Sequence, residues 1–191
     1  MSNVAGSNRR RLATWSWALW DWAEQPYPTI IQTFIFAVYI TSSSFGDKDA
    51  NTSLLSVGNM LAAIVVAVSA PVFGRRSDEA GRRKFWLLAN SGVLIAIMAA
   101  SYFVMPDPKF LMFGVALYAI GSVVQETAFI NYYAMLKQVT TPKNIGKVSG
   151  FAWGLGYVGG ILLLLISLVG FVLPETPLFG VSTANAENIR I

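Results

Sequence analysis

The 191-residue sequence contains no cysteine and no histidine. Without these side chains there is no disulfide, no thiol nucleophile and none of the usual ligand sets for zinc, haem or iron–sulfur clusters. Charge is also scarce, since Asp, Glu, Lys and Arg make up 13% of the residues, whereas soluble domains carry about 25%. We therefore expect neither a metal nor a cofactor, and no enzyme activity. The 54% hydrophobic content predicts a polytopic membrane protein.

Long apolar stretches alternate with short polar segments along the whole chain. Each is long enough to cross the roughly 30 Å hydrocarbon core of a bilayer as a helix. The sequence thus predicts an all-α integral membrane bundle with about five transmembrane helices. Their approximate ranges are 15–42, 54–73, 85–105, 110–136 and 148–173.

The basic residues lie mostly on one side of these predicted spans. The N-terminal tail and the second and fourth connections hold eleven of them: Arg9, Arg10, Arg11, Arg75, Arg76, Arg82, Arg83, Lys84, Lys137, Lys143 and Lys147. The opposite side holds three: Lys48, Lys109 and Arg190. By the positive-inside rule, residues 1–14 form a cytoplasmic tail, disordered at its start. We expect the plasma (inner) membrane of a bacterium as the location. This topology explains the net charge of +4, so we expect no nucleic-acid partner.

Five spans leave the polar segment 174–191 on the outer side. It either leads into a sixth helix that this chain lacks, or closes a protein that ends outside after five helices. We expect the former.

The second connection, 74–84, concentrates five of the fourteen Lys and Arg residues in eleven positions. Gly74 and Gly81 allow backbone turns that other residues resist, and Asp78 lies among several arginines. A loop that only sets topology needs positive charge, but neither an aspartate nor two glycines at fixed spacing. A gating loop and a purely topogenic loop are the two interpretations, and we favour the gate.

This connection also carries a family resemblance. The pattern Gly74-x-x-Ser77-Asp78-x-x-Gly81-Arg82-Arg83-Lys84 resembles the signature loop between the second and third helices of the major facilitator superfamily. The resemblance implies the N-terminal bundle of an alternating-access transporter, with Asp78 and the basic cluster helping to hold the outward-facing state. Arg76 and Glu79 depart from the pattern, which has an aliphatic and a basic residue there.

A narrower resemblance lies at both ends of the chain. The stretches Trp17-Ala-Leu-Trp-Asp-Trp-Ala23 and Phe151-Ala-Trp-Gly-Leu-Gly-Tyr-Val-Gly-Gly160 are similar to the vacuolar effluxer and unknown major facilitator branch. Glu24-Gln25-Pro26 replaces the Asn-Ser-Ala typical of that branch.

Three acidic residues, Asp21, Glu24 and Glu126, fall inside the predicted spans. A carboxylate at membrane depth costs at least about 2.5–3.5 kcal/mol and needs a partner, water or a proton. At 1.5 Å per residue, all three lie in the cytoplasmic half or near the midplane, so together with Gln25 they are predicted to line one cavity. They would carry protons or bind a cationic group; for Asp21 a structural role is equally open.

Pro26 and Pro28 interrupt the first span, because each removes a backbone hydrogen bond and kinks a helix. Beside Glu24, the freed carbonyls mark a candidate substrate or ion site, the alternative being a static kink. Glycines in the fifth span are predicted to allow close helix packing. They are Gly150, Gly154, Gly156, Gly159 and Gly160.

These features favour a proton-coupled secondary transporter of a small organic solute. Its partners would be the lipid bilayer, the solute, protons and a C-terminal half that this chain lacks. The alternative is a non-transporting membrane interaction or assembly protein derived from half a transporter.

Overall fold

The computed structural model describes residues 2–79 and 81–190; the side chains of residues 2–9 and 77–79 lie outside the description. All regular secondary structure in the described part is helical. In chain order the elements are α1 (Ser2–Glu24), η1 (Tyr27–Phe34), α2 (Phe36–Ile40), η2 (Ser43–Phe45), α3 (Lys48–Glu79), α4 (Arg83–Ser101), η3 (Pro108–Phe110), α5 (Leu111–Val139), α6 (Ile145–Ser167), η4 (Leu168–Val172), η5 (Leu178–Gly180), η6 (Ala184–Ala186) and α7 (Glu187–Arg190).

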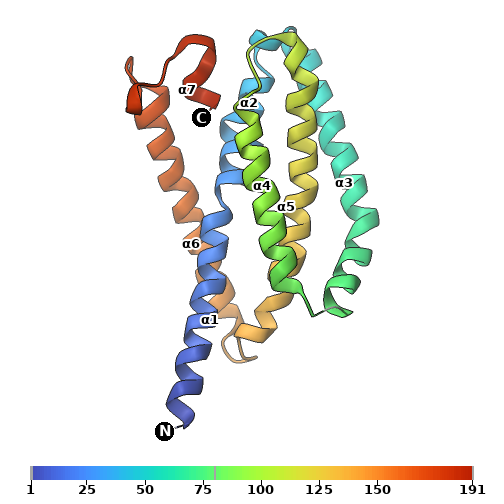
Figure 1. Cartoon of the computed structure of the whole chain (residues 1–191), viewed down its shortest axis with the longest axis vertical. Helices are drawn as coiled ribbons and strands as arrows, with labels where there is room; N and C mark the ends of the chain where they lie inside the picture. Colours follow the sequence, from blue (N-terminus) through green and yellow to red (C-terminus); the bar gives the residue numbers. More distant parts are fainter. Residues whose placement is uncertain (1, 80, 191) are drawn as a thin grey trace.

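Four helical segments of the described part are long and apolar enough to cross a membrane. They are Lys48–Arg76, Arg83–Ser101, Pro108–Val139 and Ile145–Val172, and they overlap the last four predicted spans. The first predicted span, 15–42, is divided among α1, η1 and α2 because Pro26 and Pro28 interrupt it. It still runs the length of the bundle beside α6 and α4 (Figure 1).

Two polar segments are more helical than the sequence suggested. Residues 2–11, which were expected to be disordered, belong to α1, because extending a helix that already exists costs far less than nucleating one. In the same way α3 continues through most of the second connection to Glu79, and α4 begins at Arg83. The predicted eleven-residue loop is therefore reduced to a short turn around Gly81.

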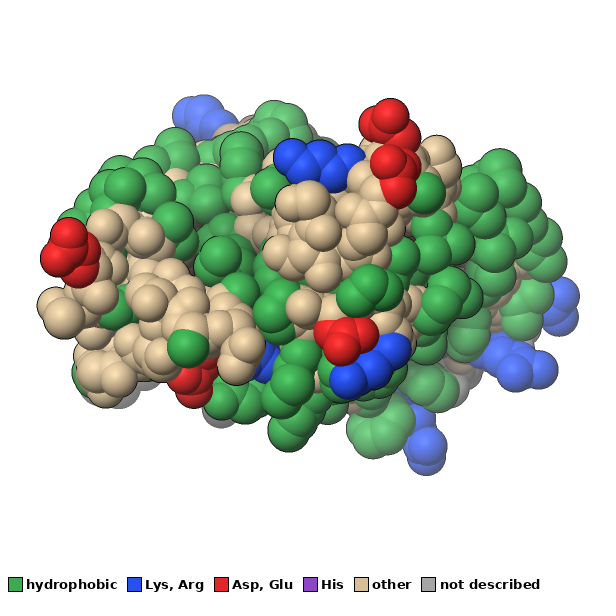
Figure 2. Space-filling model, turned by 90° about the horizontal axis from the view of Figure 1, so that it is seen from above, with side chains coloured by type: hydrophobic (Ala, Val, Ile, Leu, Met, Phe, Trp, Pro, Cys, Tyr) green, Lys and Arg blue, Asp and Glu red, His purple; other side chains and the backbone are tan. Residues whose placement is uncertain are grey.

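The bundle is built around α5, which packs against α3 and α4, while α1 packs along α6 and also contacts α5 (Figure 1). We call the end with the N-terminus and the turn at Gly81 the basic end, and the end with η2, η3 and α7 the far end. Viewed onto the far end, hydrophobic side chains cover the flanks and polar groups occupy the middle (Figure 2). Apolar flanks fit contact with lipid.

Buried side chains form two clusters along α5. Near the basic end, Trp17 of α1 stacks on Tyr132 of α5 with ring centroids 4.2 Å apart, and its Nε1 donates to the Tyr132 carbonyl at 2.9 Å. Nearer the far end, Tyr27 is buried against α5 and its hydroxyl donates to the Tyr118 carbonyl at 3.0 Å. These two anchors fix the register between the first span and α5, and the predicted polar site lies between them.

Candidate functional site

A break in the first span positions three of the predicted site residues. Asp21 and Glu24 lie in the last turn of α1, and Gln25 follows the helix directly before Pro26. Because Pro26 and Pro28 have no N–H, the carbonyls four residues earlier lose their α-helical donors. The chain continues as the π-helix η1. The three side chains therefore sit where the backbone itself is open to further hydrogen bonds.

Glu24 points toward α4. It is only 8% exposed, and its Oε2 lies 3.3 Å from Ser91 Oγ. The same Ser91 Oγ accepts a hydrogen bond from Trp20 Nε1 at 3.1 Å. An indole can only donate, so the serine proton is left for the carboxylate. Glu24 Oε1 is buried and has no partner in the described part of the chain.

Asp21 and Gln25 point toward α6 instead. A Cβ atom added at Gly156 would lie 2.9 Å from Asp21 Oδ2 and 2.8 Å from Gln25 Nε2. Gly159 approaches Trp22 in the same way, and Gly160 lies against Thr29 and Gln25. Three of the predicted packing glycines thus admit side chains of α1 and of the break that follows it. Gly150 and Gly154 have open space at their Cβ positions among the described residues, so their packing role stays a prediction.

Glu126 lies apart from this group. It is exposed on α5, whereas the adjacent Gln125 is 1% exposed. No hydrogen bond or ion pair among the described residues joins Glu126 to Asp21 or Glu24. The structure therefore brings Asp21, Glu24 and Gln25 together as an inner group and leaves Glu126 as an outer position, so one cavity shared by all four remains a prediction.

Other polar groups with buried atoms lie near the same level of the bundle and were not assigned to the site from the sequence. Trp20 packs against Tyr132 with centroids 4.6 Å apart, and Tyr27 reaches Tyr118. Along the bundle, Glu24 of α1 and Gln125 of α5 both lie between the Trp20–Tyr132 contact and the Tyr27–Tyr118 hydrogen bond. Both amide atoms of Gln125 and Nδ2 of Asn90 are buried without a partner in the described part. Such groups are rare in protein interiors, where an ordered water or a ligand often satisfies them.

The Ser91 contact gives a testable stability effect. Ser91→Ala removes the only described donor to Glu24 and leaves the Trp20 indole without its acceptor. We expect a loss of about 1–3 kcal/mol in the free energy of unfolding, measured by thermal or denaturant unfolding in detergent. Ser56→Ala is the matched control, because Ser56 is exposed and its hydroxyl bonds only to its own helix at Thr52. Equal stabilities of the two variants would contradict the bridging role.

The predicted gating motif lies at the basic end. Gly81 has φ +60° and forms the turn between α3 and α4, and Arg83 donates to the Ala134 carbonyl near the end of α5. Gly74 lies 3.8 Å, at its Cβ position, from Ile130 of α5. Arg82 and Lys84 are exposed. The Asp78 side chain is outside the described residues, so the gate itself stays a prediction.

The turn supplies a second testable effect. Gly81→Ala places a Cβ in the left-handed region, which costs roughly 1–2 kcal/mol although none of the described residues beyond its chain neighbours lies within 4 Å. We expect the midpoint of unfolding to fall accordingly. Gly92→Ala, inside α4 and equally free of contacts, is expected to be neutral or slightly stabilising. A Gly81 variant as stable as the Gly92 variant would show that the turn does not need a positive φ.

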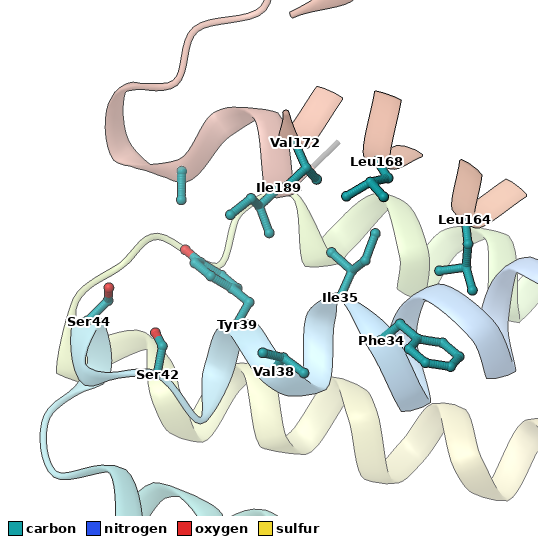
Figure 3. A pocket seen from close by; sticks show the side chains of 11 residues that line it. Phe34, Ile35, Val38, Tyr39, Ser42, Ser44, Leu164, Leu168, Val172 and Ile189 are labelled. Atoms are coloured by element: carbon teal, nitrogen blue, oxygen red, sulfur yellow. The ribbon is translucent and has the colours of Figure 1, made fainter. Parts of the chain in front are cut away.

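A separate cavity of about 650 Å³ lies at the far end between α2 and η4 (Figure 3). It is lined mainly by apolar side chains, and none of the predicted site residues reaches it. The molecule thus has a buried polar group at mid-bundle and an apolar cavity nearer the far end.

Comparison with known proteins gives a consistent result. The family model described as Major Facilitator Superfamily matches residues 9–172. An uncharacterized MFS-type transporter, YxiO of Bacillus subtilis (strain 168), is 26% identical over 179 residues, which cover 91% of this chain and 41% of that protein. The chain thus spans about two fifths of the length of this curated relative. No solved structure matches.

Proposed function

Because the chain belongs to the Major Facilitator Superfamily, we propose that it works within a proton-coupled secondary transporter that moves a small organic solute by alternating access. The all-α membrane bundle and the family, both expected from the sequence, are confirmed. Coupling, solute and direction go beyond the family. A C-terminal half supplied by a longer protein is part of the proposal.

The observation that supports proton coupling is the burial of the Glu24 carboxyl group without a described basic partner. Its carboxyl group is buried at mid-bundle, no Lys or Arg of the described residues pairs with it, and one of its oxygens has no partner. A charged carboxylate in such a place is costly. A proton removes that cost. Glu24 therefore suits a group that takes up a proton in one conformation and releases it in another.

Asp21 and Glu126 would serve the same cycle in different ways. Asp21 adjoins the α1–α6 contact at Gly156, so a change in its charge would bear on how these helices pack. Glu126 is exposed on the central helix α5, where a solute or a second bundle can reach it. We propose Glu24 and Asp21 as the inner proton-binding pair, Gln25 as their polar neighbour, and Glu126 as the position that meets the solute.

The proposed orientation places the basic end in the cytoplasm. The basic residues concentrated there support this by the positive-inside rule. At this end the Gly81 turn connects α3 to α4, and the Arg83 contact connects α4 to α5. A shift of α4 would therefore also displace the end of α5. This supports the gating interpretation of the loop.

The test is transport by the complete protein in proteoliposomes. A panel of organic solutes is applied with and without an imposed pH gradient, while a trapped pH dye reports proton flux. We expect one solute class to drive proton movement in a fixed ratio. Proton-independent uptake would contradict coupling. Absence of any flux across a broad panel would favour the alternative of a non-transporting membrane interaction or assembly protein.

A further inference from the structure

The far-end cavity is bounded by two separate membrane segments. One wall comes from the end of η1 and from α2, and the other from the end of α6 and from η4, while the segment with α7 contributes Ala186 and Ile189 (Figure 3). The apolar walls are Phe34, Ile35, Val38, Leu164, Leu168 and Val172. Its volume of about 650 Å³ falls within the range of about 300–1,000 Å³ that holds small organic ligands.

Both walls contain π-helical turns. The Ile35 amide donates to the Ile30 carbonyl at 3.1 Å, and the Leu173 amide donates to the Leu168 carbonyl at 2.9 Å. Each bond joins residues five apart, which widens the helix. Such turns are rare and occur often at functional sites. Two of them facing one cavity from different segments are not required for simply crossing a membrane.

One end of the cavity is polar. Tyr39, Ser42 and Ser44 gather there, opposite Phe34 and Leu164 (Figure 3). The Tyr39 hydroxyl is already used, since it donates to the Val104 carbonyl at 2.8 Å. The Ser42 hydroxyl is buried and has no partner in the described residues. A buried hydroxyl left unpaired costs about 1–3 kcal/mol, but the Ser42 oxygen is enclosed by protein. Ser44, which is exposed at the same end, is the hydroxyl that a ligand can meet directly.

Among the residues that the structure describes, no charged side chain lines the cavity. Arg190 follows Ile189 at its rim and is 8% exposed. Its Nη1 donates to the Tyr102 carbonyl at 2.7 Å, and its guanidinium lies 5.2 Å from the Tyr102 ring centroid. Its Nε is buried without a described partner, and its charge acts on Tyr102 and also on Tyr39 at the polar end, away from Phe34 and Leu164. An ion placed against the apolar walls would have neither an opposite charge nor hydrogen bonds to offset the loss of its hydration.

We propose that the far-end cavity binds a small neutral organic molecule, with its apolar body between the π-helical walls and one hydrogen-bonding group at the polar end beside Ser44. The further role of this cavity as a binding site for the transported solute at the far end rests on the proposed transport function. Binding of a neutral molecule does not depend on that function.

The test uses the absence of cysteine from this chain. Ser44→Cys is introduced into the complete protein, and N-ethylmaleimide labelling of that position is followed by mass spectrometry in nanodiscs. The probes are 1-octanol, octanoate and octylammonium at equal concentration. We expect octanol to slow labelling about tenfold more than either ion, because burying an unpaired charge is costly. Ser16→Cys, exposed near the basic end, is the control for partition into the bilayer and should be unaffected.

Three outcomes would overturn binding of a neutral molecule. They are equal protection by all three probes, equal protection of the Ser16 control, and preferential protection by octanoate, which would place the Arg190 charge in the cavity. Leu168→Trp fills the cavity and should abolish protection by octanol. Leu165→Trp, on an exposed position of α6 that does not line the cavity, should retain it. If Leu168→Trp fails to fold, Val38→Trp tests the same point from the opposite wall.

The role of the far-end cavity as a solute site is tested separately from the proposed transport function. Glu24→Gln should keep the protection by octanol, because binding at the far end needs no proton. Leu168→Trp should raise the solute concentration for half-maximal uptake. Unchanged uptake in this variant would overturn the solute role and leave proton-coupled transport standing. If the protein with Glu24 intact showed no proton-coupled uptake while octanol still protected Ser44→Cys, the proposed transport function would fail and binding at the far end would stand.

Discussion

Glu24→Gln in the complete protein is expected to reduce proton-driven uptake to the background of protein-free vesicles. Glutamine keeps the shape of glutamate and accepts the Ser91 hydrogen bond, so expression and unfolding temperature should stay close to those of the unchanged protein. It cannot take up and release a proton at this position. The measurement is uptake with an imposed pH gradient, alongside the signal from a trapped pH dye.

The controls separate coupling from a general effect of removing a carboxylate. Glu175→Gln removes an exposed carboxylate at the far end and should leave uptake unchanged. Glu126→Gln, on the exposed face of α5, should also abolish coupled uptake while preserving stability. Unchanged uptake in both Glu24→Gln and Glu126→Gln would rule out acid coupling in this half of the transporter.

Gly121→Ala is expected to cause the largest loss of stability. The Cβ position of Gly121 overlaps the Tyr27 phenol, and Tyr27 is 1% exposed and donates to the Tyr118 carbonyl. A methyl group displaces the ring, so the cost combines overpacking of about 1–3 kcal/mol with a lost buried hydrogen bond of about 1–3 kcal/mol. The thermal midpoint should fall by on the order of 10 °C.

Gly150→Ala is the matched control for this effect. Gly150 also lies inside a membrane helix, but nothing lies within 4 Å of its Cβ position. Alanine there should be neutral or stabilise by about 0.5–1 kcal/mol, because glycine loses more freedom in a helix. Equal midpoints for the two variants would show that Tyr27 does not pack against α5 as described.

Proline positions show how far local sequence reasoning extends. Pro26 and Pro28 predicted an interruption of the first span, and α1 ends at Glu24 with η1 beginning at Tyr27. The π-helical form of the continuation was not predictable, because it depends on where Thr29 and Ile35 find carbonyl partners after the break. The second π-helix, η4, contains no proline, and Pro174 follows only after its end.

The site residues show the limit more clearly. Asp21 and Glu24 were identified because charge at membrane depth is costly whatever the fold. The sequence did not show which way these side chains point. Asp21 faces Gly156 of α6, whereas Glu24 faces Ser91 of α4. Ser91 gave no signal, because a single serine is ordinary in a membrane helix and acquires its role only from the distant Trp20 and Glu24.

The sequence by itself determined the all-α membrane bundle, four of its spans and the family. Runs of about twenty apolar residues are readable without a fold, as is the fixed spacing of the basic loop. Only the tertiary structure decided that Gln125 is buried and Glu126 exposed. In water the buried face of a helix shows as an apolar stripe, but in a bilayer both the lipid face and the packed face are apolar. Neighbouring residues then differ only by the helices that happen to cover them.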